Sequence, residues 1–310
     1  MILLIGKVFS ILAMVGIGFI LYRSGKLGDQ ACTDLTTLLL TVTAPCLSIY
    51  TLYEKDLTEE TMVSSAQAFI GSICYVAVAT FLAYGAVKLL KAKKEDLTCY
   101  VILMVGVNNG FMGFPVTKEI FGSDILYLVV IHNIFMNTYF YCIAAMQLNS
   151  GKGFHLKEAG KSLFSPVMIF MFLGIAMLFL DLEPPELIDD LIRTIGDSTV
   201  PLSMIVVGLQ LGKSNLKGIL HNRTLLFSSL ISMAVFPLLT FLIVEALPLY
   251  TGAKIAIIFS SAFPSAVVPV ALAEQYGRNA KLMAEGVTIT TILSMLTIPV
   301  MASLLTAWYY

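Results

Sequence analysis

Two segments of the sequence combine prolines and glycines with short polar side chains inside apolar stretches. The first reads VGVNNGFMGFPV over residues 105–116, and the second reads SSAFPSAVVPVA over residues 260–271. Proline removes a backbone donor and clashes with the preceding helical turn, and glycine leaves helical geometry easily. We therefore expect a break in the helix within each segment. Backbone groups freed at such a break, together with amide and hydroxyl side chains, can bind a ligand.

The residues around the two breaks favour an anionic ligand. A second half-helix is expected to begin near Pro115 in the first segment and near Pro269 in the second, because the first position of a helix needs no backbone donor. The free N–H groups at such a start carry partial positive charge, so two starts facing one cavity would bind an anion without lysine or arginine. The alternative interpretation is a pair of helices that are merely kinked. The predicted substrate-binding residues are Asn108, Asn109, Gly110, Pro115, Pro264, Ser265 and Pro269.

The bulk composition places these segments in a membrane protein. Of the 310 residues, 58% are hydrophobic and 13% are charged, and the mean hydropathy is +0.88. A soluble domain has roughly 45–50% apolar and about 25% charged residues. The net charge of −1 gives no argument for a nucleic-acid partner. We predict an all-α protein in the lipid bilayer with ten transmembrane helices, at residues 2–22, 32–52, 62–89, 98–121, 124–149, 162–181, 188–211, 224–247, 254–275 and 281–308.

The basic residues indicate how these helices cross the membrane. If the N-terminus is outside, the cytoplasmic loops hold 14 of the 19 Lys and Arg residues, and acidic residues follow the second and sixth helices on the outer side. The pattern predicts a multi-pass protein of the plasma or inner membrane with both termini outside. The five remaining basic residues are Lys7, Lys55, Lys118, Arg193 and Lys254.

The two halves of the sequence repeat one another. Pro115 and Pro269 are 154 residues apart, and Pro45 and Pro201 are 156 apart. This nearly constant shift predicts two five-helix repeats, residues 1–150 and 151–310. A unit with an odd number of helices inserts its second copy upside down, so the repeat is inverted and the interrupted helices are the fourth and the ninth. Paired interrupted helices at corresponding positions point to a central binding site.

These motifs resemble the auxin efflux carrier family, which includes plant PIN auxin exporters and bacterial malate and malonate permease-like proteins. The resemblance rests on FPSAVVPVALAEQYG at 263–277, on the segment from Asn108 to Pro115, and on GDSTVPLSMIVVGLQL at 196–211. It covers essentially the whole chain. The crossing pair of helices is shared in outline with bile-acid symporters and sodium/proton antiporters.

The resemblance implies an organic-anion substrate at the crossing of helices 4 and 9, scaffold and transport bundles drawn from both repeats, an elevator-like motion and a homodimer. Asn108 matches an asparagine of the PIN substrate site. This chain has Ser265-Ala266 where PIN proteins have Gln-Gly, its third helix has no charge before Lys88 at the cytoplasmic end, and it lacks the long cytoplasmic loop of many plant members. These departures favour the compact bacterial type over an auxin exporter.

Four ionisable residues in or near apolar spans are candidates for proton or ion coupling: Glu119, Glu274, His132 and Asp197. Glu119 and Glu274 are related by the 155-residue shift, and each follows its proline by about one turn. The alternative interpretations are an interfacial position for the glutamates and hydrogen-bonded packing for His132, which lies near Asn133 and Asn137.

The sequence lacks the motifs of enzymes and of metal or cofactor sites. There is no HExxH, GxSxG or P-loop motif, and the five cysteines form no CxxC pair. We therefore predict a protein that is not an enzyme and binds no metal or cofactor, namely a secondary transporter of a small organic anion such as a carboxylate. The alternatives are a membrane receptor that binds an organic acid without moving it, and a cation/proton antiporter.

Overall fold

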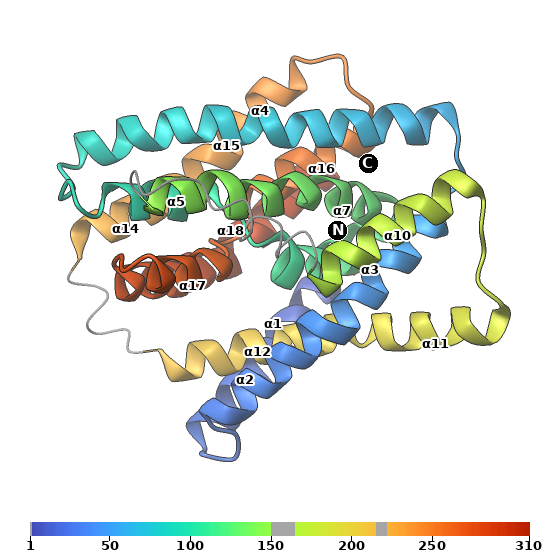
Figure 1. The fold of residues 1–310 in the computed structure, drawn as a ribbon, viewed down its shortest axis with the longest axis horizontal. Coiled ribbons are helices and arrows are strands. Elements are labelled where there is room, and N and C mark those ends of the chain that lie inside the picture. The colour runs from blue at the N-terminus through green and yellow to red at the C-terminus, as the bar shows by residue number, and fades with distance from the viewer. Residues whose placement is uncertain (1, 150–164, 215–221) are drawn as a thin grey trace.

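The computed structural model describes residues 2–149, 165–214 and 222–310, and the regular structure in this part of the chain is all helical apart from one isolated β-bridge. Figure 1 shows the arrangement, with the long helix α4 along one edge. The α-helices are α1 (Ile2–Arg23), α2 (Asp29–Leu38), α3 (Ala44–Tyr53), α4 (Glu59–Leu89), α5 (Leu97–Val105), α6 (Phe114–Phe121), α7 (Ser123–Thr138), α8 (Ala145–Asn149), α10 (Pro166–Leu180), α11 (Glu186–Asp197), α12 (Thr199–Lys213), α14 (Arg223–Leu230), α15 (Phe236–Glu245), α16 (Thr251–Ser261), α17 (Val268–Gln275) and α18 (Ala280–Tyr309). Four π-helical turns join some of them: η1 (Leu39–Thr43), η2 (Asn109–Gly113), η3 (Tyr139–Ala144) and η4 (Ile231–Val235).

The helices are long and apolar enough for a multi-pass membrane protein. Within the described residues, seven helical rods have the length and composition to cross a membrane, and α10 and α16 are shorter apolar helices. The stretches 98–121 and 254–275 are each predicted as one span, but non-helical residues divide both of them. The break in the first stretch separates α5 from η2, which continues into α6. The break in the second stretch separates α16 from α17. Part of the predicted span 162–181 lies outside the described residues.

Three of the π-helical turns have a common cause in proline. η1, η2 and η4 each end two residues before a proline, namely Pro45, Pro115 and Pro237. Proline has no N–H to donate and clashes with the carbonyl four residues earlier. A turn widened to the i→i+5 pattern removes that conflict and keeps the helix continuous. The prolines therefore widen these helices without ending them.

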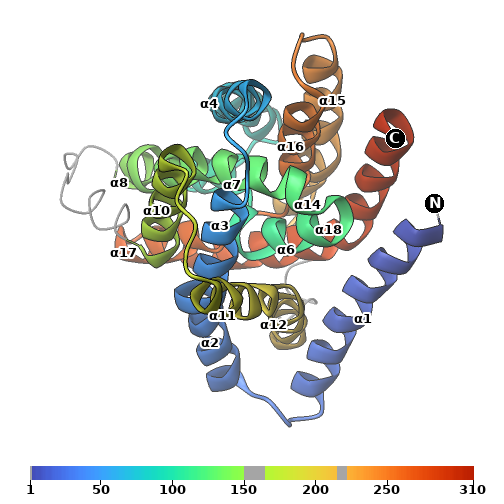
Figure 2. The same cartoon turned by 90° about the vertical axis from the view of Figure 1, so that its right-hand side faces the viewer.

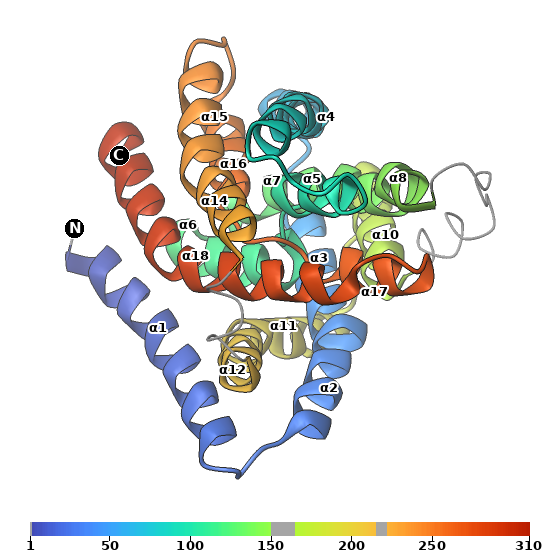
Figure 3. The same ribbon diagram turned by 90° about the vertical axis from the view of Figure 1, so that its left-hand side faces the viewer.

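The helices form two bundles. The first bundle contains α1–α3 and α10–α12, and the second contains α4–α8 and α14–α18; most contacts between helices lie within one bundle or the other. Figures 2 and 3 show α1 and α2 as the two arms of a V, with α11 and α12 between them. The bundles meet mainly where α6 contacts α12 and α1, and where α7 contacts α3. Each bundle takes helices from both halves of the sequence.

The first bundle contains an unusually close helix contact. A Cβ atom added at Gly208 of α12 would lie 2.1 Å from the carbonyl oxygen of Val15 on α1. A Cβ added at Gly18 of α1 would lie 2.0 Å from the carbonyl oxygen of Ile205. Small residues let backbones approach closely in membranes, where packing replaces the hydrophobic effect as the force between helices. The two glycines therefore set the distance between α1 and α12.

Candidate functional site: the paired helix breaks

The two predicted breaks lie side by side and hydrogen-bond to each other. The amide of Asn108 donates to the carbonyl of Pro264 at 2.8 Å, and the amide of Ala266 donates to the carbonyl of Gly106 at 2.9 Å. Val107 and Ser265 form an antiparallel β-bridge between them. Non-helical backbone at membrane depth must be satisfied within the protein. Each break supplies partners for the other, so the interruptions are more than two independent kinks.

Ser265 and Thr290 stabilise the second break. The Ser265 hydroxyl donates to the carbonyl of Leu103 at 2.5 Å, satisfying a group near the end of α5. The Ser265 amide donates to the Thr290 hydroxyl of α18 at 3.1 Å. Both side chains are buried. The sequence predicts that Ser265 contacts substrate, whereas in the structure its hydroxyl donates its proton to a backbone carbonyl. Thr290 supports the break in a way that the sequence analysis did not identify.

We expect Thr290→Val to destabilise the protein, because valine keeps the shape and leaves the buried Ser265 amide without an acceptor. A lost acceptor of this kind costs about 1–3 kcal/mol, which corresponds to a fall in melting temperature of about 5 °C. Thr291→Val is the matched control, since the buried Thr291 hydroxyl only donates to the carbonyl of Val287. Thermal unfolding of the purified variants compares them. Equal melting temperatures for both would show that the Ser265–Thr290 bond contributes nothing.

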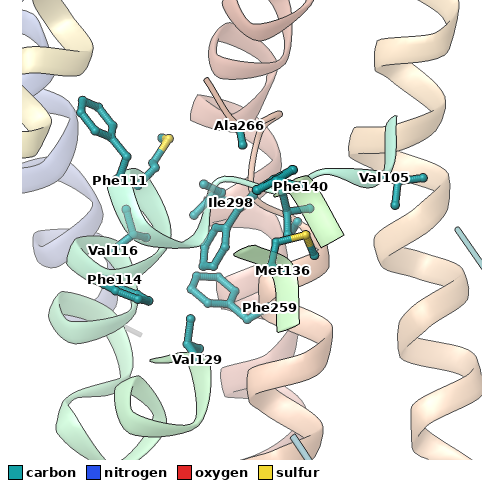
Figure 4. Packing of buried hydrophobic residues seen from close by; sticks show 14 of the residues in the cluster. Val105, Phe111, Phe114, Val116, Val129, Met136, Phe140, Phe259, Ala266 and Ile298 are labelled. Atoms are coloured by element: carbon teal, nitrogen blue, oxygen red, sulfur yellow. The ribbon is translucent and has the colours of Figure 1, made fainter. Parts of the chain in front are cut away.

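Buried apolar side chains surround the breaks (Figure 4). A Cβ at Gly106 would lie 2.4 Å from the Phe140 ring, and one at Gly113 would lie 2.5 Å from the Phe263 ring. The Phe259 ring packs edge-on against Phe263, with centroids 5.0 Å apart. These aromatic side chains fill the space beside the breaks, and glycine is required where the backbone passes close to them. The positions of the breaks are therefore fixed by packing as well as by hydrogen bonds.

The second half of the first interrupted helix begins earlier than predicted. It was expected to start near Pro115, but its helical turns begin at Asn109, where η2 continues directly into α6. The side chain of Asn108 causes this, because its Oδ1 accepts a hydrogen bond from the amide of Phe111 at 3.3 Å and so caps the helix. In the second interrupted helix, α17 begins at Val268, with Pro269 in its first turn.

The two predicted asparagines have different surroundings. Asn108 is half-buried, and with Oδ1 occupied by the cap, its Nδ2 group can donate to a ligand. Asn109 is 1% exposed, and its Nδ2 donates to Nδ1 of the fully buried His132 on α7 at 2.9 Å. In the described part of the chain, Asn109 Oδ1 and His132 Nε2 have no hydrogen-bond partner. Asn109 therefore ties the start of the half-helix to α7, and Asn108 is the better candidate for substrate contact.

The other predicted residues divide between the breaks and the surface. Gly110 is half-buried beside Asn108, and a Cβ there would meet only Asn133 Nδ2, at 3.8 Å. Glu119 is half-buried and Glu274 exposed. All three prolines of the predicted site are buried, namely Pro115, Pro264 and Pro269.

Asp197 lies at the end of α11, where its carboxylate pairs with Lys118 and accepts a hydrogen bond from the Tyr50 hydroxyl at 2.6 Å. The structure thus places Asp197 with residues of α3 and α6, and its partner Lys118 directly precedes Glu119. A coupling role for Glu119, Glu274, His132 or Asp197 stays a prediction.

A cavity of about 240 Å³ lies elsewhere, between α4, α15 and α16. Its lining is almost entirely apolar, with Ile70, Val78, Phe236 and Ile257 among the residues. An anion would lose its hydration there, and Gln67, Tyr75 and Thr240 are the few polar side chains of the lining that could compensate. We therefore do not place the substrate in this cavity. Among the described residues, no group of three or more His, Cys, Asp or Glu side chains is arranged to hold a metal ion.

Comparison with known proteins identifies the family. The sequence matches the family described as membrane transport protein over residues 3–160 and 154–302. The chain belongs to this family. It is the auxin efflux carrier family whose motifs the sequence resembles.

Three related proteins are similar to this chain along nearly their whole length. An uncharacterized transporter of Methanothermobacter thermautotrophicus is 25% identical over 300 residues, covering 94% of this chain and 95% of the relative. An uncharacterized transporter of Methanocaldococcus jannaschii is 24% identical over 303 residues, with coverage of 94% and 95%. A protein of Rhizobium meliloti named as a candidate malonate transporter is 23% identical over 300 residues, with coverage of 93% and 92%.

Proposed function

We propose that this membrane transport protein is a secondary transporter that moves a small organic anion, a carboxylate, across the membrane. The substrate would bind at the paired breaks. In this proposal the helical rods form ten transmembrane segments in two inverted repeats, 1–150 and 151–310, with α5–α6 and α16–α17 as the crossing fourth and ninth segments. Both termini lie outside the cell membrane, as the basic residues predict, and homodimerisation stays a prediction.

The observation that carries this proposal is the hydrogen-bonded pairing of the two breaks. Because the paired segments are antiparallel, the half-helices that follow them, starting at Asn109 and Val268, both begin where the breaks meet. The first N–H groups of a helix have no partner within it and carry the positive end of the helix dipole. Two helix starts that meet at one point can bind an anion even though no basic side chain takes part.

Asn108 supplies the polar contact in this proposal. Its backbone amide and Oδ1 are engaged by Pro264 and Phe111, so among the described residues Nδ2 is the group of Asn108 that is left to donate to a ligand. A hydrogen bond from this amide to a carboxylate is charge-assisted and worth about 1.5–3 kcal/mol. Gly110 next to it is half-buried and leaves room for the ligand. The predicted role of Asn109 changes in this proposal, because its Nδ2 holds His132.

The substrate class is supported by two separate lines. The site has converging helix starts and an amide donor, which suits a carboxylate, and one relative carries the name of a candidate malonate transporter. Motion is supported by the division into two bundles with a limited contact surface between them. Sliding of the second bundle, which carries both breaks, along the first would expose the site to each side in turn.

Ligand-dependent thermal unfolding of the purified protein tests the binding part of this proposal. Malonate is compared with malonamide, the neutral diamide of the same carbon skeleton. Malonate should raise the melting temperature with a saturable dependence on concentration, because a ligand that binds only the folded state stabilises it, and malonamide should not. Equal stabilisation by both compounds would contradict an anion site. No stabilisation by malonate, malate, lactate or indole-3-acetate would contradict a carboxylate substrate.

A further inference from the structure

The five basic residues outside the predicted cytoplasmic loops all have oxygen partners in the structure. Arg193 pairs with Glu54 and Asp189, and Lys254 pairs with Glu245. These contacts stay within one bundle. The contacts of the other three residues, Lys7, Lys55 and Lys118, all join the first bundle to the second.

Lys118 makes the central one of these contacts. It lies on α6, directly after the first break, and its ammonium group contacts the Asp197 carboxylate and the Tyr50 hydroxyl of the first bundle. The ammonium nitrogen also lies 4.7 Å from the centroid of the Tyr50 ring. The Tyr50 hydroxyl in turn donates to Asp197 at 2.6 Å. One buried tyrosine thus holds a cation from one bundle and an anion from its own.

The two other contacts join the same part of the second bundle. Lys55, which follows α3, pairs with Asp124 at the start of α7 and lies 5.3 Å from the Tyr127 ring centroid. The ammonium group of Lys7 on α1 donates to the carbonyl of Ile120 at 3.3 Å. All three therefore reach the corner between α6 and α7, residues 118–127, where Gly122 turns the chain with φ of +79°.

We propose that Lys118, Lys55 and Lys7 form an outer latch, which holds the corner between α6 and α7 against the first bundle and closes the outer path to the paired breaks. The inference rests on the proposed function, because it assumes that the bundles move. The second bundle cannot slide along the first without separating these contacts. The structure is then the state that is closed to the outside.

The exposure of the charges suits a contact that opens in each cycle. The Asp197 side chain is 61% exposed and that of Lys118 is 23% exposed, so water can replace the partner of each when they separate. A deeply buried pair would have to expose an uncompensated charge to a low dielectric. Exposed ion pairs are weak, so loss of one shifts the balance between closed and open states by about fivefold at most.

The test measures how accessible the paired breaks are from outside, and it does not require the protein to transport a substrate. Gly110→Cys places a thiol beside Asn108, where the added Cβ meets no atom closer than 3.8 Å. A membrane-impermeant maleimide is applied to the outer face of right-side-out vesicles, and the labelling rate is measured. The same chain without Gly110→Cys gives the background from the native cysteines.

Lys118→Met and Tyr50→Phe should each raise the outer labelling rate of Gly110→Cys about two- to fivefold. The matched controls are Lys254→Met and Tyr53→Phe, which should not change the rate. Tyr53 donates to Asp189 at 2.6 Å, also from α3 to α11, but no lysine of the second bundle contacts it among the described residues. The double variant Lys118→Asp with Asp197→Lys restores the attraction and should label as slowly as the unmodified latch.

Unchanged labelling in Lys118→Met and Tyr50→Phe would overturn the latch, as would an equal increase in the control variants. If Lys118→Met does not fold, Tyr50→Phe and the charge-swapped double variant decide the matter. Failure of the proposed function would be seen separately, as absence of anion binding or flux by the wild-type protein.

Discussion

Replacing Asn108 by aspartate should weaken anion binding and transport on the order of a hundredfold. The substitution separates the two roles of this residue. Aspartate caps a helix as well as asparagine does, so the bond to the Phe111 amide and the start of η2 are retained. The Nδ2 donor is replaced by a negatively charged oxygen, which repels a carboxylate. The measurement is the malonate concentration at half-maximal uptake in proteoliposomes.

The matched control for this prediction is Asn222→Asp. Asn222 caps α14 by accepting from the Leu225 amide at 3.1 Å and lies near the Tyr100 hydroxyl, which can donate to an aspartate as well. Uptake by Asn222→Asp should equal that of the wild type. Asn108→Ala, which loses both cap and donor without adding charge, should lower affinity less, by about tenfold. Wild-type affinity in Asn108→Asp would remove Asn108 from the site.

Gly208→Ala should destabilise the protein by about 3 kcal/mol, which lowers the melting temperature by about 5–10 °C. The added Cβ would lie 2.1 Å from the Val15 carbonyl oxygen and 2.7 Å from the Phe19 amide nitrogen. Both are backbone atoms, so no side-chain rotation relieves the clash and α1 must move away from α12. Thermal unfolding of the purified protein is the measurement.

Gly16→Ala on the same helix α1 is the control for the glycine contact. No heavy atom lies within 4 Å of a Cβ added there. Alanine also favours a helix over glycine by about 1 kcal/mol, so Gly16→Ala should leave stability unchanged or slightly raised. A similar melting temperature for Gly208→Ala and Gly16→Ala would show that α1 does not depend on this close approach.

The breaks themselves were predictable from sequence because their cause is local. Proline and glycine act on the turn in which they occur, so residues 105–116 and 260–271 are recognisable without any tertiary information. The place where the half-helix starts was less predictable. Pro115 indicates a start near itself, but the cap made by Asn108 and the widened turn η2 begin the helix at Asn109. The capping residue Asn108 and Pro115 lie only a few residues apart, and each is a possible start of the helix. The sequence alone does not decide which of the two marks the start.

The partners of the site could not be predicted, because they come from distant helices. Thr290 resembles its neighbours Thr288 and Thr291 in sequence, and only the position of α18 brings its hydroxyl to Ser265. Asp197 is a candidate for ion coupling in the sequence because it lies within the predicted transmembrane span 188–211. Its pairing with Lys118, 79 residues away, depends on how the two bundles meet. A polar residue in an apolar stretch can be recognised from the sequence, but its contacts are known only from the fold.

Uptake of radiolabelled malonate into proteoliposomes, by the wild type and by Asn108→Asp in parallel, is the decisive measurement. An uptake measurement distinguishes a transporter from a receptor that only binds the acid. It also detects transport that moves no net charge across the membrane. We predict saturable uptake by the wild type, competition by other small carboxylates, and loss of uptake in Asn108→Asp while Asn222→Asp remains active. Folded wild-type protein that binds malonate but shows no saturable uptake would contradict transport. Uptake that persists undiminished in Asn108→Asp would contradict a substrate site at the paired breaks.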